Sequence, residues 1–239
     1  MKYLPNEDIE QINSQLGCID NGDTRIFCRM EAYSCKRTRE DKELKRHMNS
    51  KYENDDDILL DVLSPRSPFG PLSQMTSRKT LFYLLGTLNA VYPDYDFSDI
   101  KPELFTKIPA IGMAINHVNN LFLVQFENSQ GQIGQTIWNT VDQVISTNNC
   151  DIYQFTPDRD IEPDAEEGNL WSFYYFFYNK QDKRILFFSG RAVSLLAPIQ
   201  PEENVQIIYD YDYDEDRNQN HADHTSLSYE QYTMQAMEI

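Results

Sequence analysis

The sequence contains few glycines and none of the motifs in which enzymes use them. Nine of the 239 residues are glycine, and neither a Gly-rich phosphate-binding loop nor a Gly-x-Ser-x-Gly nucleophile motif occurs. The His-Glu-x-x-His pattern of zinc proteases is also absent. We therefore expect a protein that is not an enzyme, with no catalytic residue, no metal site and no cofactor.

Basic residues are also scarce. The chain has 21 Lys and Arg against 38 Asp and Glu, which gives a formal net charge of -17. Much of this charge lies in residues 201–239, where ten acids accompany a single base, Arg217. Contacts to phosphates require an excess of Lys and Arg, so we expect no direct, specific binding of nucleic acid. A basic protein surface is the better candidate partner for so acidic a chain.

Cysteine pairs and long apolar runs are missing as well. The four cysteines at positions 18, 28, 35 and 150 form no Cys-x-x-Cys pair and lack zinc-ligand spacing. The first residues, Met-Lys-Tyr-Leu-Pro-Asn-Glu-Asp, do not resemble a signal peptide. No apolar run approaches the length of a membrane span. We expect free thiols in a reducing compartment, no membrane association, and a cytosolic or nuclear location.

Aromatic residues are abundant, and they concentrate in residues 170–191. This stretch is predicted to form two strands joined by the polar residues 179–183. Side chains alternate between the two faces of a strand, and here both faces are aromatic. A strand with one face in water would alternate apolar with polar residues, so this one should be central and covered on both sides. One face carries Trp171, Phe173, Tyr175 and Phe177, and the other carries Tyr174, Phe176 and Tyr178.

The rest of the chain before residue 197 alternates between helical and strand patterns. Asn6 is a candidate N-cap for the first helix. The basic run 36–47 is either a nuclear-import patch or a solvated helix face, and we favour the helix face. We predict helices at residues 7–16, 77–92, 109–126 and 132–147, a short helix starting within 101–105, and strands at 2–4, 24–33 and 150–155.

Residues 49–76 are typical of a linker, because three prolines and a glycine within residues 65–71 disfavour helix and central strand. Ser64 and Ser67 each precede a proline, which makes them candidates for proline-directed phosphorylation. We divide the chain into a first part of a globular domain (1–48), this flexible linker (49–76), a second part of the same domain (77–197) and a disordered acidic tail (198–239).

Three separated blocks resemble the Maf-one family, whose members are negative regulators of RNA polymerase III. The blocks are residues 1–42 with Glu31-Ala-Tyr-Ser-Cys-Lys36; residues 77–98 with Pro93-Asp-Tyr-Asp-Phe-Ser98; and residues 150–184 with Trp171-Ser-Phe-Tyr-Tyr-Phe-Phe-Tyr-Asn-Lys180. Together they span most of residues 1–191. The second and third motifs are highly specific when they occur together and in this order.

The resemblance implies an α/β fold: a single domain in which a mainly antiparallel central sheet has helices on both faces. It also implies a repressor that binds the RNA polymerase III core and blocks its recruitment by transcription factor IIIB. Nutrient-dependent phosphorylation in the TOR pathway, by kinases and opposed by a phosphatase, would shift such a protein between nucleus and cytoplasm. Ser64, Ser67 and Ser73 lie in the matching linker and are the expected phosphorylation sites.

For polymerase contacts we select an aromatic residue at the entry of the hairpin and cations on its turn and on the helix after the linker. These are Trp171, Lys180, Lys183, Arg184, Arg78 and Lys79. Two other hypotheses remain. An enzyme would use Asp94 and Asp96 in a cleft with convergent carboxylates of raised pKa, although both could instead bond local backbone amides in a turn. A cytosolic phospho-adaptor would act through the acidic tail.

Overall fold

The structure is a computed structural model that describes residues 1–20, 22–52, 67–123, 130–163 and 168–196. The predicted tail at 198–239 and half of the predicted linker, residues 53–66, lie outside these residues. A seven-stranded antiparallel sheet runs through the described domain, in the order β1-β3-β7-β6-β5-β4, with β2 also paired to β3. Its strands are β1 (Lys2–Tyr3), β2 (Ile19–Asp20), β3 (Thr24–Ser34), β4 (Phe105–Ile108), β5 (Cys150–Phe155), β6 (Asn169–Asn179) and β7 (Arg184–Ser194).

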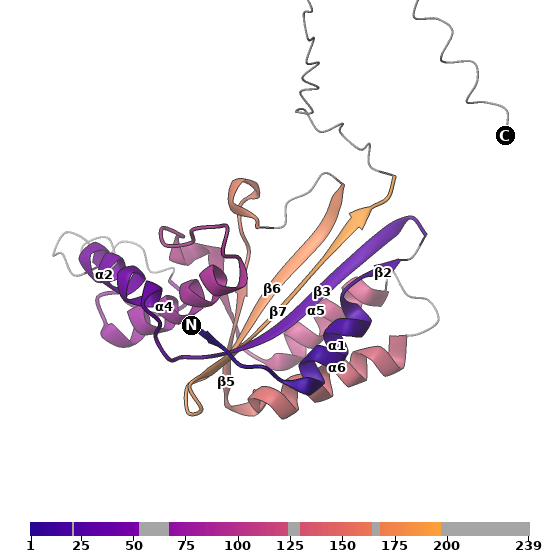
Figure 1. Ribbon diagram of the computed structural model, residues 1–239, viewed down its shortest axis with the longest axis horizontal. Coiled ribbons are helices and arrows are strands. Elements are labelled where there is room, and N and C mark those ends of the chain that lie inside the picture. The colour runs from indigo at the N-terminus through magenta and orange to yellow at the C-terminus, as the bar shows by residue number, and fades with distance from the viewer. Residues whose placement is uncertain (21, 53–66, 124–129, 164–167, 197–239) are drawn as a thin grey trace, which may run out of the picture. The chain divides into compact units, whose positions relative to one another are not determined.

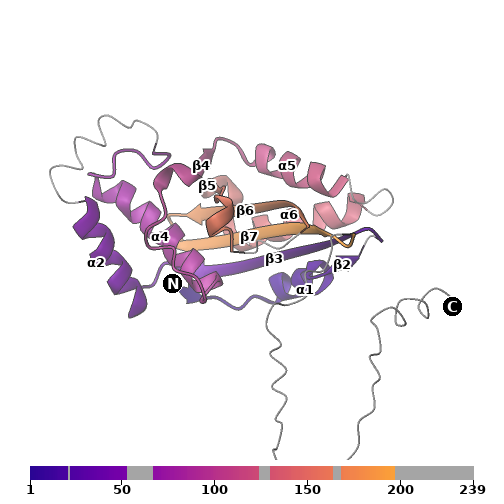
Figure 2. The same ribbon diagram turned by 90° about the horizontal axis from the view of Figure 1, so that it is seen from above.

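Helices cover both faces of this sheet, as Figures 1 and 2 show. On one face lie α2 (Glu40–Tyr52) and α4 (Met75–Val91). On the other lie α1 (Glu7–Leu16), α5 (Ile111–Leu123) and α6 (Gln130–Ile145). Three short 3₁₀ turns complete the described elements: Pro102–Leu104, Thr147–Asn149 and Arg159–Ile161. The predicted α/β fold, with a mainly antiparallel sheet between two helical layers, is therefore confirmed.

The aromatic hairpin β6–β7 is the centre of the sheet, as its sequence pattern predicts. Phe173, Tyr175 and Phe177 are buried in the cluster under α1, α5 and α6. Tyr174 and Phe176 are buried in the cluster under α4. Each such ring buries roughly 150–250 Å² of surface, so the two aromatic faces of β6 contribute to two separate hydrophobic cores. The alternation of side chains along one strand thus holds helices on both sides of the sheet.

The local signals for helix ends are confirmed at α1 but not at α4. Asn6 Oδ1 accepts a hydrogen bond from the Ile9 amide at 3.0 Å, which caps α1. The helix predicted at residues 77–92 begins earlier, at Met75, and Gln74 at its N-cap position makes no side-chain cap. Eleven residues of α4 are buried, so packing between α2 and the sheet stabilises it without that cap.

A second local prediction is wrong in part. The sequence pattern suggested a short helix starting within residues 101–105, but only the turn Pro102–Leu104 is helical. The chain then forms β4, the edge strand that pairs with β5. Phe105 and Ile108 are buried while Thr106 and Lys107 are exposed. This pattern lacks the strict alternation that would have revealed a strand.

Candidate protein-binding surface

The turn of the central hairpin is shaped by one buried side chain, Asn179. Its Oδ1 accepts hydrogen bonds from the amides of Gln181 and Asp182, both at 3.0 Å. Its Nδ2 donates to the Ile145 carbonyl and to the Asp182 carboxylate, also at 3.0 Å. Asparagine commonly stabilises turns through such bonds to the following backbone. The turn ends at Lys183, whose φ of 54° lies in the left-handed region.

Lys183 lies beside the end of β3. Its carbonyl accepts a hydrogen bond from the Cys35 amide at 2.8 Å. Burial raises the pKa of the Cys35 thiol to about 12, while the positive charges of Lys79 and Lys183 oppose that shift. Both cations are therefore near the same buried thiol, although they come from α4 and from the hairpin turn. The fold brings together two of the cations that the sequence analysis selected.

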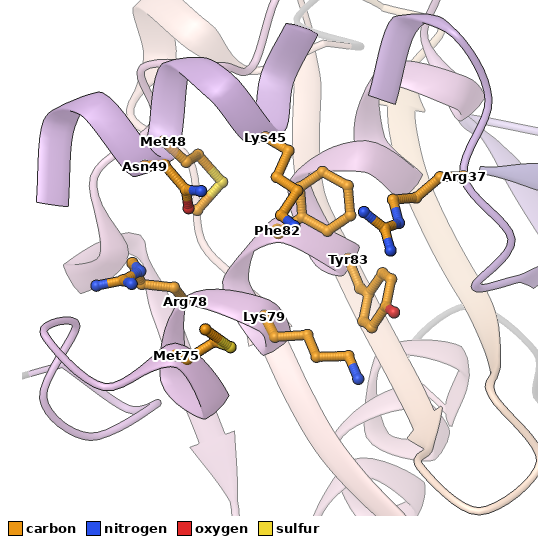
Figure 3. Close-up of a pocket in the computed structure, with 9 residues that line it drawn as sticks. All are labelled: Arg37, Lys45, Met48, Asn49, Met75, Arg78, Lys79, Phe82 and Tyr83. Carbon is orange, nitrogen blue, oxygen red and sulfur yellow. The ribbon is translucent and has the colours of Figure 1, made fainter. Parts of the chain in front are cut away.

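A hollow of about 200 Å³ opens next to Lys79, between α2 and α4 (Figure 3). Arg37, Lys45 and Lys79 surround its Phe82 and Tyr83 side chains in this view. The Lys79 Nζ lies 5.8 Å from the centre of the Tyr83 ring. Nine described residues line the hollow, and four of them are cationic while none is acidic: Arg37, Lys45, Met48, Asn49, Met75, Arg78, Lys79, Phe82 and Tyr83. We call Arg37, Lys45, Lys79 and Lys183 the basic surface.

Arg78 also lines the hollow, but its guanidinium group has a structural role. Nη1 donates to the carbonyls of Leu72 and Ser73, at 3.1 and 2.9 Å, and more weakly to that of Tyr52 at 3.3 Å. These bonds fasten the last residue of α2 and the segment before α4 to the start of α4. Of the two helix cations selected from the sequence, Arg78 positions the chain and Lys79 faces solvent.

The remaining cations of the turn differ in how they are paired. Lys180 forms an ion pair of 2.5 Å with Asp151, which also pairs with Lys107 at 2.9 Å. Burial acts to raise the pKa of Asp151, but the hydrogen bonds from Lys180 and Lys107 outweigh it, and the pKa lies below its usual value. Arg184 is exposed at the first position of β7. Lys180 is thus partly neutralised, whereas Lys183 and Arg184 have no ion pair among the described residues.

Trp171 lies apart from these cations. It pairs with Ala192, whereas Asn179 at the turn pairs with Arg184. The eight residue steps from Trp171 to Asn179 correspond to about 26 Å of strand. The half-buried indole stacks on Phe173 with an interplanar angle of 14°. The structure therefore does not bring the six selected residues into one site: Trp171 belongs to the opposite end of the hairpin.

Two of the three candidate phosphorylation sites, Ser67 and Ser73, lie in the described segment that precedes α4. Ser64 falls outside the described residues. Ser67 is half-buried, and its Oγ accepts a hydrogen bond from the Phe69 amide at 3.4 Å. Phe69 packs against Phe105 and Tyr153 of the sheet, with ring centres 5.6 and 5.1 Å apart. Ser73 is exposed next to Arg78. A phosphate on Ser73 would therefore be added beside the hollow.

The proposed carboxylate cleft is not formed by Asp94 and Asp96. Both side chains are exposed. The Asp96 carboxylate accepts a hydrogen bond from the Ser98 amide at 2.9 Å, and hydrogen bonding to Ser98 lowers its pKa. The enzyme hypothesis required convergent carboxylates with raised pKa values, so its prediction for Asp96 is wrong. This turn serves instead to bring Phe97 into the core, where it is 1% exposed.

Other features constrain the chemistry of the described residues. All four cysteines of the chain lie within the described residues, and each is a free thiol, as expected from the sequence. Within the same residues, His, Cys, Asp and Glu nowhere gather in a group of three or more that could hold a metal ion. No described helix has the length and apolar character needed to cross a membrane.

Sequence reasoning missed the hollow, although it identified most of its cations. Arg37 and Lys45 belong to the run that we interpreted as a solvated helix face, and Lys79 was selected for a different reason. What connects them is the apolar spacing of Leu44 and Met48, which buries one side of α2 against α4. That spacing was visible in the sequence, but it does not identify the helix against which α2 packs.

Comparisons with known proteins match this chain over most of its length. A family model described as "Maf1 regulator" matches residues 26–189. A "Repressor of RNA polymerase III transcription" from Dictyostelium discoideum is 32% identical over 240 residues, covering 82% of this chain and 86% of its own length. A "Repressor of RNA polymerase III transcription maf1" from Schizosaccharomyces pombe is 35% identical over 207 residues, covering 81% of this chain and 85% of its own.

Solved structures agree with the sequence matches. A crystal structure of citrus MAF1 aligns with a TM-score of 0.59 and 31% sequence identity. The alignment covers 79% of this chain and 99% of the citrus chain. A second crystal form of the citrus protein aligns with a TM-score of 0.58. The resemblance inferred from the three sequence blocks is confirmed.

Proposed function

Because this chain belongs to the Maf1 regulator family, we propose that it is a repressor of RNA polymerase III transcription. Relatives that align with more than four-fifths of the chain carry this function in their names. The single observation that carries the proposal is the match over residues 26–189, which includes β6, the first half of β7 and all four residues of the basic surface.

The mechanism that we propose is binding rather than catalysis. The protein would contact the polymerase core and block its recruitment by transcription factor IIIB. Support comes from the basic surface, where Arg37, Lys45, Lys79 and Lys183 have no ion pair among the described residues. Unpaired surface cations lower the cost of docking an acidic partner surface, because no existing bond must first be broken.

Phosphorylation of Ser64, Ser67 and Ser73 would control this binding. Each phosphate would add about 1.5 to 2 negative charges at neutral pH. Ser73 is next to Arg78, which lines the same hollow as Lys79, so a phosphate there would reduce the positive potential of the basic surface. Regulation by nutrient-dependent kinases and a phosphatase, and movement between cytoplasm and nucleus, are parts of this proposal.

Charge reversal tests the role of the basic surface. The variant Lys79→Glu with Lys183→Glu should lose about tenfold or more of its affinity for purified polymerase at low salt. The matched control is Lys101→Glu with Arg159→Glu, which changes the net charge equally at exposed cations that do not belong to the basic surface. If both variants are retained equally on the polymerase at several salt concentrations, the basic surface does not take part in polymerase binding.

A further inference from the structure

The hollow between α2 and α4 has the chemistry of a peptide-binding site. We propose that it binds an acidic peptide segment of a partner protein, which inserts one aromatic or aliphatic side chain between Met48, Met75 and Phe82. This inference rests on the proposed function and deepens it, because it names the chemistry of the segment that the repressor would recognise. It is argued from the charge of the rim, the apolar floor and the exposed Met75 at the edge of the hollow.

The rim selects for negative charge. Arg37, Lys45 and Lys79 lie around the opening (Figure 3), and no acidic residue of the described chain lines it. Such a cluster of cations without a neighbouring acid contrasts with the net charge of -17 of the whole chain. Asp41 of α2 does not line the hollow, and its carboxylate accepts hydrogen bonds from the buried amino group of Met1 at 2.7 and 2.6 Å. The positive potential of the rim is therefore not cancelled locally.

The floor selects for an apolar side chain. Met48, Phe82 and Tyr83 are 2%, 5% and 8% exposed, so they form a fixed base. Met75 at the edge is 76% exposed. Methionine is flexible and polarisable, and it is enriched at surfaces that pack against varied partners. The opening of about 200 Å³ has room for one large side chain. A nucleic-acid backbone or a free phosphate would make no use of such a floor.

The guanidinium of Arg78 is not free to receive a phosphate. The strongest sites for phosphate use a guanidinium fork that donates two parallel hydrogen bonds. Here Nη1 of Arg78 already donates to the carbonyls of Leu72 and Ser73. Lys45 and Lys79 act as single point charges on mobile stems, which suits scattered carboxylates along a peptide.

The test uses the full-length protein with ¹³C-labelled methionine methyl groups. The probe is a synthetic peptide in which one phenylalanine is flanked by Asp and Glu on both sides. We expect it to shift the methyl signals of Met75 and Met48. Met113, which is exposed on α5, and Met30, which is buried under α1, serve as internal references and should not move.

Affinity is then compared among charge variants at about 50 mM salt, where surface charges are weakly screened. Lys45→Glu with Lys79→Glu should weaken peptide binding about tenfold or more. Arg46→Glu is the matched control for Lys45→Glu, since it makes the same charge change at the adjacent, exposed position of α2 outside the hollow. It should change the affinity less than about twofold. A peptide with alanine in place of phenylalanine should also bind about tenfold more weakly.

Three outcomes would overturn the inference: no shift at Met75, equal binding of the alanine peptide, or equal weakening by Arg46→Glu. Polymerase retention measured on the same variants separates this inference from the proposed function. If Lys45→Glu with Lys79→Glu abolishes peptide binding but not retention on the polymerase, the hollow is not where the polymerase binds, while the repressor function stands. If the unmodified protein binds the peptide but not the polymerase, the proposed function fails and the peptide site is retained.

Discussion

The aromatic ring of Phe173 lies directly across Gly190 on the neighbouring strand. The two residues are register partners in β6 and β7, and a Cβ atom placed on Gly190 would lie 2.5 and 2.6 Å from two ring carbons. The same atom would lie 3.0 Å from the sulfur of Cys28 on β3. Gly190 is therefore required by the space that the ring occupies, and the three central strands meet at this position.

We predict that Gly190→Ala lowers the free energy of unfolding by about 1–3 kcal/mol, the usual cost of overpacking a filled core. Urea unfolding measures the change. Gly112→Ala is the control, because nothing lies within 4 Å of its Cβ position and alanine suits a helix better than glycine. Adding Phe173→Leu should recover part of the loss at Gly190. Additive effects of the two substitutions would contradict the contact.

Asn179 should determine the stability of the hairpin turn. Removing its side chain leaves the amides of Gln181 and Asp182 and the Ile145 carbonyl without their partner. We predict that Asn179→Ala lowers the free energy of unfolding by about 1–3 kcal/mol. Gln181→Ala, at an exposed position of the same turn, should have an effect within about 0.5 kcal/mol. Similar losses for both variants, measured by urea unfolding, would mean that the Asn179 bonds do not organise the turn.

His117 should make stability depend on pH. Burial lowers its pKa below the ordinary 6.5, and its Nδ1 lies 2.7 Å from the hydroxyl of Tyr175. Burial raises the pKa of that phenol to about 12, so Tyr175 stays protonated and donates to the neutral imidazole. The unfolded state binds a proton more readily than the folded state. The stabilisation that the neutral imidazole gives to the folded state is therefore fully present above pH 6.5. It is lost as the pH falls through the lower pKa of His117 in the folded state.

The free energy of unfolding, measured in urea between about pH 8 and pH 5, should fall more steeply for the unmodified protein than for His117→Gln. Both proteins keep every other titrating group, so the difference between their curves isolates the imidazole. If the two curves run parallel through this range, His117 does not contribute to the pH dependence.

Phosphorylation of the two Ser-Pro sites should oppose nuclear retention. We predict that Ser64→Ala with Ser67→Ala increases the nuclear fraction and the repression of polymerase III transcripts in nutrient-rich medium. Microscopy and transcript levels measure the two effects. Ser14→Ala, on the exposed side of α1 and not followed by proline, is the control. An unchanged distribution of the double variant would exclude these serines as the switch.

The sequence predicted the parts of the fold that depend on local pattern. The alternating aromatics from Trp171 to Tyr178 assigned each side chain to its face, and the strand 150–155 was predicted with its correct bounds. Where the pattern was weak, prediction failed. The strand β4 begins directly after a Pro-containing turn, and the pair Thr106 and Lys107 breaks its alternation. Its pairing with β5, which is distant in the sequence, stabilises it as a strand.

The candidate site was less predictable because it is made by long-range contacts. The basic character of Lys79 and Lys183 is plain in the sequence. Their common position beside Cys35 follows from the pairing of β3 with β7 and from the packing of α4 on the sheet. Arg78 was selected as a contact residue, whereas its bonds to the carbonyls of Leu72 and Ser73 give it a structural role. Charge can be counted from a sequence, but its pairing depends on the fold.

The most direct test of the proposed function is a recruitment assay with purified components. RNA polymerase III is added to promoter DNA that already carries transcription factor IIIB, with and without the unphosphorylated protein, and polymerase retained on the promoter is measured. We predict that the protein reduces retention in proportion to its own binding to the polymerase, and that Lys79→Glu with Lys183→Glu restores retention. Undiminished recruitment at protein concentrations that saturate the polymerase would contradict the proposed mechanism.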